Sequence, residues 1–259
     1  MREDRGEPYV YYHIPKCGGT SIGENAKLNL GRRQVLSVYK RYLPLNLKAF
    51  EGYTHQTHIK LIKSHIPFGS VPAISAFRSF TILRDPEARI ASLMQDVSTR
   101  PSHYLHDSLG GCDFSIKRFI ENAPVYEIDN VLVRYLIGEK GFTKPEVDNA
   151  DLQKAIHVLH EGLTWFGLQE DFENTLKILA SELGFQFITK RRKNASSRKL
   201  KFSEDLRRGI ESCIKFDSRL YEIATKLYAK RMEENPPAEL SCMDNRLILA
   251  AAKIRSFCS

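Results

Sequence analysis

Short apolar runs and apolar residues at helical spacing divide the chain into alternating strands and helices. Residues 9–14 are aromatic and β-branched, which is typical of a buried strand. Further strands are predicted at residues 59–64, 79–83 and 165–168, with 34–39 as a short strand or helix edge and 185–188 as a possible last strand. Strands that alternate with helices predict an α/β fold of three layers, in which helices cover both faces of a central parallel sheet.

Helical spacing dominates the chain after Asp113, so the C-terminal half is predicted to be rich in helices. One helix start is particularly clear, because Asp85 is a good N-cap and Pro86 suits the first helical position. Two separate helices are predicted around residues 206–214 and 220–227, and a short one at 246–254. We expect a single domain over residues 1–235 and a C-terminal tail over 236–259.

Residues 9–22 predict a strand, a tight loop and a helix start in direct succession. Gly18 and Gly19 permit positive φ and a close approach of the backbone to a ligand, and Thr20 or Ser21 is expected to cap the helix. This geometry points free N–H groups and a positive helix dipole at an anion, to which Lys16 adds a full charge. We interpret the segment as a phosphate-binding loop.

Two common nucleotide-binding loops do not fit this segment. The loop of nucleotide triphosphatases places its lysine after the glycine, whereas Lys16 precedes Gly18, and the dinucleotide pattern Gly-x-Gly-x-x-Gly is absent. Asp85 is only a weak candidate for a magnesium ligand. The loop therefore favours a phosphate-like ligand that is bound without a metal.

Three chemically distinct features follow predicted strands: the Lys16 loop, His65 and Arg84. In a parallel sheet, ligands bind at the carboxyl ends of the strands, so these features are expected at one edge. An imidazole titrates near neutral pH, which makes His65 a candidate general base, with His55 and His58 as alternatives.

The chain is basic, with a formal net charge of +8 and a pI of about 9.2, which favours anionic partners. Its five cysteines (Cys17, Cys112, Cys213, Cys242 and Cys258) are scattered and lack metal-ligand spacing, so zinc and a disulfide framework are not expected. The N-terminus does not resemble a signal peptide, and no apolar run is long enough to span a bilayer. We expect a cytoplasmic enzyme, or one of the Golgi lumen if an N-terminal anchor was removed.

Three motifs resemble those of sulfotransferases that use 3′-phosphoadenosine 5′-phosphosulfate. Residues 13–21 resemble the 5′-phosphosulfate loop of that family, and residues 83–92 resemble its 3′-phosphate motif, with Arg84 and Ser92 eight positions apart. Residues 64–69 resemble a segment of the carbohydrate branch, the relatives of the heparan sulfate 2-O- and 6-O-sulfotransferases. Residues 134–138 and 165–170 are similar to stretches of the same branch. Cys17 and Ser64 depart from the usual threonine and glycine.

The resemblance implies a P-loop-like fold, a site and a reaction. The donor 3′-phosphoadenosine 5′-phosphosulfate would pass its sulfuryl group by direct in-line displacement to an acceptor hydroxyl, most simply of a carbohydrate, without a metal. His65 would be the base and Lys16 would stabilise the leaving phosphate. The residues implied in donor binding are Lys16, Cys17, Gly18, Gly19, Thr20, Ser21, Arg84, Ser92, Asn194, Ser196, Ser197 and Arg198.

Two other functions account for parts of the pattern. A kinase-like phosphotransferase would explain the loop, although its Gly-Lys-Ser/Thr signature is missing. A non-enzymatic binder of nucleic acid or acidic glycans would explain residues 190–201, where seven of twelve residues are basic, although no aromatic residues are interspersed for base stacking. We expect the acceptor to contact residues 40–58 and 99–111, because acceptor sites are built from variable loops.

Overall fold

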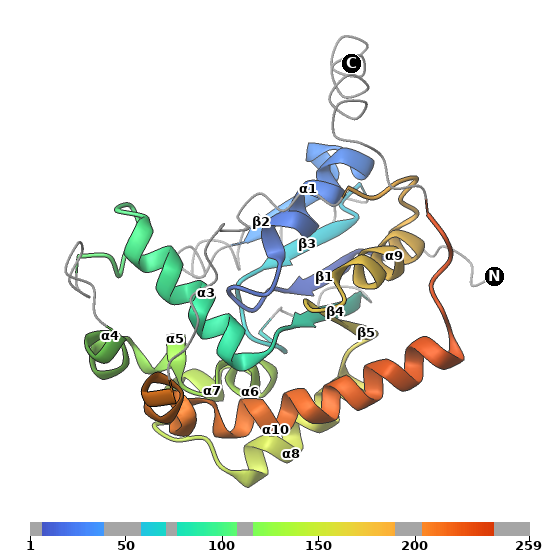
Figure 1. The fold of residues 1–259 in the computed structure, drawn as a ribbon. Coiled ribbons are helices and arrows are strands. Elements are labelled where there is room, and N and C mark those ends of the chain that lie inside the picture. Colours follow the sequence, from blue (N-terminus) through green and yellow to red (C-terminus); the bar gives the residue numbers. More distant parts are fainter. Residues whose placement is uncertain (1–6, 39–57, 71–76, 108–115, 190–203, 241–259) are drawn as a thin grey trace.

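The protein is analysed as a computed structural model, which describes residues 7–38, 58–70, 77–107, 116–189 and 204–240 (Figure 1). Five strands form one sheet: β1 (Tyr9–Tyr12), β2 (Val35–Val38), β3 (Leu61–Ser64), β4 (Arg78–Leu83) and β5 (Trp165–Leu168). Their order is β2-β3-β1-β4-β5, and every neighbouring pair is parallel. The predicted parallel sheet is confirmed, and residues 34–39 contain the strand β2. Residues 185–188 form only an isolated bridge at Ile188.

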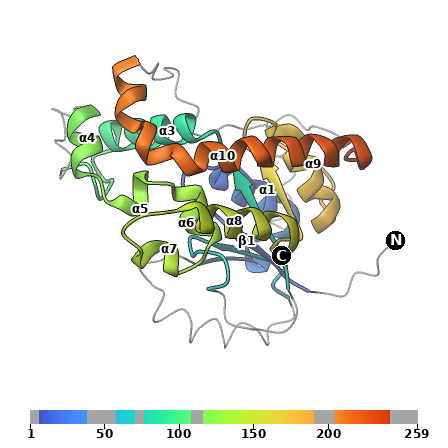
Figure 2. The same cartoon turned by 90° about the horizontal axis from the view of Figure 1, so that it is seen from below.

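Helices lie on both sides of this sheet, which confirms the three-layer prediction. Helices α1 (Gly19–Leu30) and α9 (Phe172–Leu183) lie on one side, while α6 (Val131–Leu136), α8 (Asn149–His157) and α10 (Glu204–Glu234) lie on the other (Figures 1 and 2). The remaining helical segments are η1 (Arg32–Gln34), α3 (Pro86–Thr99), α4 (Ile116–Asn122), α5 (Val125–Ile128), α7 (Lys140–Thr143) and the π-helical turn η4 (Val158–Gly162).

A stack of three aromatic rings fixes the centre of the sheet. Tyr11, Phe80 and Trp165 are register partners on β1, β4 and β5, so their side chains project from the same face. The ring centroids of Tyr11 and Phe80 are 4.7 Å apart, and those of Phe80 and Trp165 are 4.4 Å apart, with nearly parallel planes. Such pairs contribute about 0.5–1.5 kcal/mol each beyond the area they bury. The stack therefore holds β1 rigidly beneath the loop that follows it.

Two helix predictions need correction. Helix α1 is preceded by Gly18 in the left-handed conformation (φ 80°), and no side chain caps it, so the capping role expected of Thr20 or Ser21 is wrong. The two C-terminal helices are one continuous helix, α10. Residues 215–219 contain no glycine or proline that would end the helix, and Asp217 is fully buried rather than exposed in a loop.

Asn130 and Asp217 join α10 to the start of α6. The Asp217 carboxylate accepts hydrogen bonds from the N–H groups of Leu132 (3.0 Å) and Val133 (2.9 Å), which are otherwise unsatisfied at a helix start. In return, the Asn130 side-chain oxygen accepts from the N–H groups of Phe216 and Asp217. Insertion of a side chain into a helical ladder bends a helix. This accounts for the bend of α10 in Figure 2.

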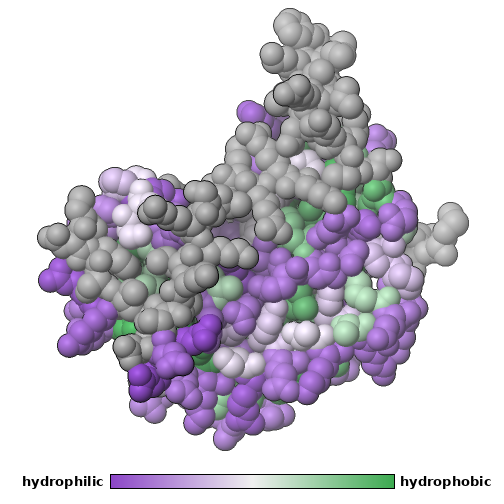
Figure 3. Space-filling view, in the orientation of Figure 1, coloured by the Kyte–Doolittle hydropathy of each residue, from purple (hydrophilic) through white to green (hydrophobic). Residues whose placement is uncertain are grey.

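The surface along α10 is mainly hydrophilic (Figure 3), and no helix in the described ranges is long and apolar enough to cross a membrane. The predicted domain boundary falls just after α10, which ends at Glu234. The first residues of the tail still contact the fold, because Glu239 lies 3.2 Å from the Lys177 ammonium on α9. The helix predicted at 246–254 lies outside the described residues.

The Asp217 carboxylate is expected to be required for the junction of α6 and α10. Asp217→Ala removes the acceptor of two buried N–H groups, and each unsatisfied group costs about 1–3 kcal/mol. We expect the free energy of unfolding to fall by about 2–4 kcal/mol, measured by urea denaturation. The exposed neighbour Ser218→Ala is the matched control and should change it by less than about 0.5 kcal/mol. An equal effect of the two substitutions would contradict this role.

Candidate active site

The carboxyl ends of β1, β3 and β4 meet at the centre of the sheet, because β1 is hydrogen-bonded to both other strands. The Lys16 loop follows β1, His65 directly follows β3, and Arg84 directly follows β4. The chain places β2 and β3 on one side of β1 and β4 and β5 on the other. This edge is therefore the topological switch point, where open parallel sheets bind ligands. The predicted convergence of the three features is confirmed.

The loop between β1 and α1 is held in an unusual conformation. Lys16 has a φ of 70°, which is uncommon for a residue other than glycine, and Gly18 has a φ of 80°. Two neighbours leave no room for side chains: a Cβ atom on Gly18 would lie 2.1 Å from Gln169, and one on Gly19 would lie 2.1 Å from the His13 ring. The first turn of α1 contains no acidic residue and no side-chain cap. The helix start is thus arranged to receive an anion.

Cys17 faces the interior and not the loop surface. Its side chain is fully buried, its carbonyl accepts a hydrogen bond from the Tyr11 hydroxyl (3.0 Å), and burial raises the pKa of its thiol to about 12. The residue therefore stays a neutral thiol and contributes to the loop through its backbone and its packing. Nothing in the structure explains why a cysteine stands here in place of threonine.

Lys16 projects toward the C-terminal part of the neighbouring helix α3 (Pro86–Thr99). Its ammonium lies 2.8 Å from the Asp96 carboxylate, which also contacts Arg100 at 3.0 Å. Ser92 lies one helical turn before Asp96, so the two side chains share a face of α3, and Ser92 is half-buried. The two residues of α3 that face the loop are therefore a hydroxyl and a carboxylate. Asp96 therefore holds the Lys16 ammonium beside α3.

Arg84 is joined directly to the loop. One terminal nitrogen donates a 3.0 Å hydrogen bond to the Lys16 carbonyl, while its buried Nε has no partner among the described residues. Asp85 caps α3 as predicted, since its carboxylate accepts from the Ala88 N–H at 2.8 Å. This hydrogen bond engages the only aspartate that we had considered for magnesium. Among the described residues, no group of three or more acidic, histidine or cysteine side chains is placed to hold a metal.

His65 lies against a second histidine, which our sequence analysis did not consider. His13 Nδ1 is 2.9 Å from His65 Nε2, and both rings lie next to the buried Lys63. Burial and the charge of Lys63 lower the pKa of His65 to about 4, and burial with nearby positive charge lowers the pKa of His13 well below 6.5. Burial and the Lys27 charge lower the pKa of Lys63 itself to about 8. Both imidazoles are therefore neutral at pH 7.

Two further polar residues border the site. Gln169 follows β5, its side-chain oxygen lies against Gly18, and that oxygen has no hydrogen-bond partner in the described ranges. Arg89 is fully buried on α3, where it donates to the Glu127 carbonyl at 2.9 Å, and its charge acts on the buried Cys17 of the loop. Both lie within segments that resemble the sulfotransferase motifs, but neither residue has a spacing or charge pattern that would single it out. Only the fold brings them to the loop.

Several predicted residues cannot be placed or lie elsewhere. Asn194, Ser196, Ser197 and Arg198 lie outside the described residues, as do His55 and nearly all of the expected acceptor segment 40–58. His58 is exposed and precedes β3, whereas His65 follows it. Because a strand rises about 3.3 Å per residue, His58 lies at the opposite edge of the sheet. Of the three histidines considered as base, only His65 is placed at the carboxyl edge.

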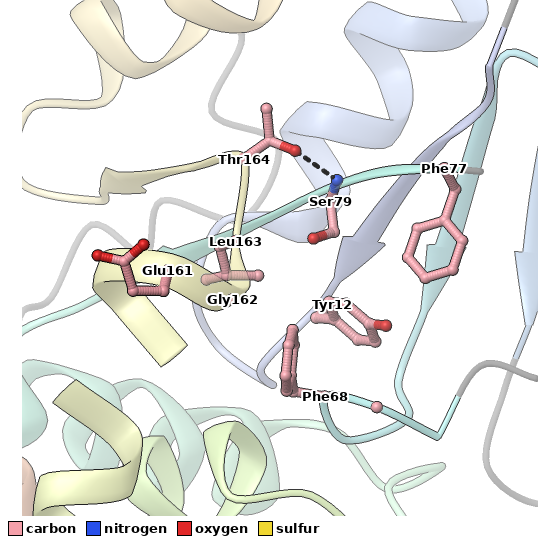
Figure 4. A pocket seen from close by; sticks show the side chains of 9 residues that line it. Tyr12, Phe68, Phe77, Ser79, Glu161, Gly162, Leu163 and Thr164 are labelled. Carbon is pink, nitrogen blue, oxygen red and sulfur yellow. Dashed lines mark hydrogen bonds between the residues drawn. The ribbon is translucent and has the colours of Figure 1, made fainter. Parts of the chain in front are cut away.

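A cavity of about 390 Å³ lies under the sheet face that carries Tyr12 (Figure 4). Aromatic rings from Tyr12, Phe68 and Phe77 line it, together with the carboxylate of Glu161 at the end of η4. Phe68 stands three residues after His65, and its ring centroid is 5.3 Å from that of Tyr12. The residue Phe68 thus lines the cavity only three positions after His65 in the chain. The cavity itself lies on the face of the sheet opposite Tyr11 and α1.

The chain was compared with known proteins. No protein-family model matches the sequence, and no curated protein does. Among solved structures, the fold is similar to that of the mouse sulfotransferase SULT7A1, whose crystal structure is a complex with PAP. The two chains are 12% identical, the TM-score is 0.49, and the match covers 87% of this chain and 89% of the mouse chain.

Proposed function

We propose that this protein transfers a sulfuryl group from 3′-phosphoadenosine 5′-phosphosulfate to the hydroxyl group of an acceptor. The observation that carries the proposal is the 3.0 Å hydrogen bond between Arg84 and the Lys16 carbonyl, which joins the two motifs for the donor in one site beside His65. The resemblance of residues 64–69 to the carbohydrate branch supports a carbohydrate hydroxyl as the acceptor.

The residues present fit this donor at both of its anionic ends. The start of α1, which has no side-chain cap and no acidic residue in its first turn, suits the 5′-phosphosulfate. Arg84 has a buried Nε without a partner among the described residues, and a phosphate oxygen would satisfy it. Ser92, on helix α3, which begins two residues after Arg84, would supply a hydroxyl to the 3′-phosphate. Gln169, with its unpaired buried oxygen against Gly18, borders the same space.

The roles in the reaction follow from charge and position. His65 takes the proton of the acceptor hydroxyl, whose oxygen attacks the sulfur while the bond from sulfur to the bridging phosphate oxygen breaks. The products are the sulfate ester and 3′-phosphoadenosine 5′-phosphate. Lys16 exchanges Asp96 for the bridging oxygen and, with the N–H groups at the start of α1, stabilises the charge that develops there. Lys63 adds positive charge beside His65.

The first prediction concerns the donor nucleotide. Arg84→Ala should weaken binding of 3′-phosphoadenosine 5′-phosphate by about 10- to 100-fold, because a charge-assisted hydrogen bond contributes about 1.5–3 kcal/mol. Thermal-shift titration measures this, with ATP as the comparison ligand. Arg78→Ala, at the opposite end of the same strand, is the matched control and should bind normally. Absence of any stabilisation of the native protein by 3′-phosphoadenosine 5′-phosphate would refute the proposed function.

The second prediction separates catalysis from binding. His65→Ala should lower sulfate transfer by about 10²- to 10⁴-fold, because the acceptor loses its base, while nucleotide binding stays near normal. Transfer is followed with sulfur-labelled donor and a carbohydrate acceptor that the native protein sulfates. His58→Ala, an exposed histidine on the other side of β3, serves as the control. If both activity and binding fall together, or neither falls, His65 is not the base.

A further inference from the structure

The two histidines at the site are held together by backbone as well as side chains. The His13 N–H donates to the Ser64 carbonyl at 2.7 Å, which extends the parallel pairing of β1 and β3 by one residue beyond the strands. His65 is the next residue after Ser64. The rings meet at a centroid distance of 4.2 Å and an interplanar angle of 71°, with His13 Nδ1 2.9 Å from His65 Nε2.

The His13 ring has little freedom to turn away from this contact. Its side chain is buried, and one edge of the ring lies so close to Gly19 that a Cβ atom there would overlap it. The ring of Tyr11 lies on another side, at a centroid distance of 5.2 Å. His13 is therefore packed between the start of α1, which belongs to the proposed donor loop, and the proposed base.

Only one arrangement of protons is compatible with a base at His65. Each neutral imidazole carries one N–H, so the 2.9 Å contact has one donor and one acceptor. If His13 Nδ1 donated, His65 Nε2 would accept and His65 Nδ1 would carry the proton, which leaves no basic nitrogen for the hydroxyl. If His65 Nε2–H donates, then Nδ1 of His65 is the basic nitrogen, and His13 carries its proton on Nε2.

We propose that His13 is a positioning residue: its Nδ1 accepts a hydrogen bond from His65 Nε2–H and thereby selects His65 Nδ1 as the nitrogen that receives the acceptor proton. The proposal rests on the proposed sulfuryl transfer with His65 as base. Once His65 takes the proton, its Nε2–H becomes the donor of a charge-assisted hydrogen bond, which is stronger than the neutral one. His13 thus orients the base in the ground state and stabilises the imidazolium as it forms.

The tautomers can be measured without any assay of activity. In the intact protein with ¹⁵N-labelled histidine, long-range ¹H–¹⁵N correlation spectra at pH 7 should show His13 and His65 each protonated on Nε2. In His13→Leu, the fraction of His65 that is protonated on Nδ1 should rise, because the acceptor for Nε2–H is lost. His106→Asn, which replaces another buried histidine that contacts the Val97 carbonyl, should leave the His65 signals unchanged. A proton on Nδ1 of His65 in the native protein would overturn the proposal.

Kinetic rescue tests the same contact by a second route. His13→Leu should lower kcat for sulfate transfer by about 10- to 100-fold, with binding of 3′-phosphoadenosine 5′-phosphate unchanged. His13→Asn can place an acceptor oxygen near the position of Nδ1 and should recover most of the loss. Transfer by His13→Leu at the native rate, or equal loss in both variants, would refute the positioning role. A native protein that binds no nucleotide would instead refute the proposed function, whatever the tautomers are.

Discussion

The parallel hydrogen bonding of β1 between β3 and β4 is the constraint on which the rest of the site depends. Because the three strands run side by side in register, the residues that follow them are brought to one edge, although they lie up to 68 positions apart in the chain. The aromatic stack of Tyr11, Phe80 and Trp165 makes this register rigid, since a slip of one residue would turn every ring to the other face. The stack therefore fixes the relative positions of the residues that follow β1 and β4.

Several cationic side chains gather at this edge of the sheet, among them Lys16, Lys63 and Arg84. Asp96 neutralises Lys16, and burial, with the charge of Lys27, lowers the pKa of Lys63 to about 8. An anionic donor would replace Asp96 as the partner of Lys16 and would also lessen the repulsion among the cations. The reduced repulsion adds to the binding free energy that the direct contacts provide. Burial, together with nearby positive charge, lowers the pKa of His13 and His65 and keeps both neutral, which is the protonation state that a general base requires.

Helices of the C-terminal half are joined to this edge of the sheet by polar contacts. Asp217 and Asn130 fasten α10 to α6 through buried hydrogen bonds, and Glu170, which follows β5, reaches both the Tyr221 hydroxyl on α10 and the Asp85 N–H at the start of α3. A long helix that bears mainly hydrophilic residues is thus tied to the core by a few buried polar contacts. Hydrophobic periodicity alone could not reveal these contacts, because Asp and Asn are typical of turns and helix caps and would be expected on the surface.

The sequence by itself determined the strands, the parallel sheet and the three segments that converge, because hydrophobic runs, glycines and the Asp85–Pro86 helix start are local signals. It led to Lys16, His65 and Arg84 through their positions after strands. Only the tertiary structure decided that Gly18 precedes α1 as its cap, that α10 is one bent helix, that Lys16 is held by Asp96, and that His13 contacts His65. Those features depend on contacts between residues that lie far apart in the chain, such as Lys16 with Asp96 and Asn130 with Phe216, and no local pattern encodes them.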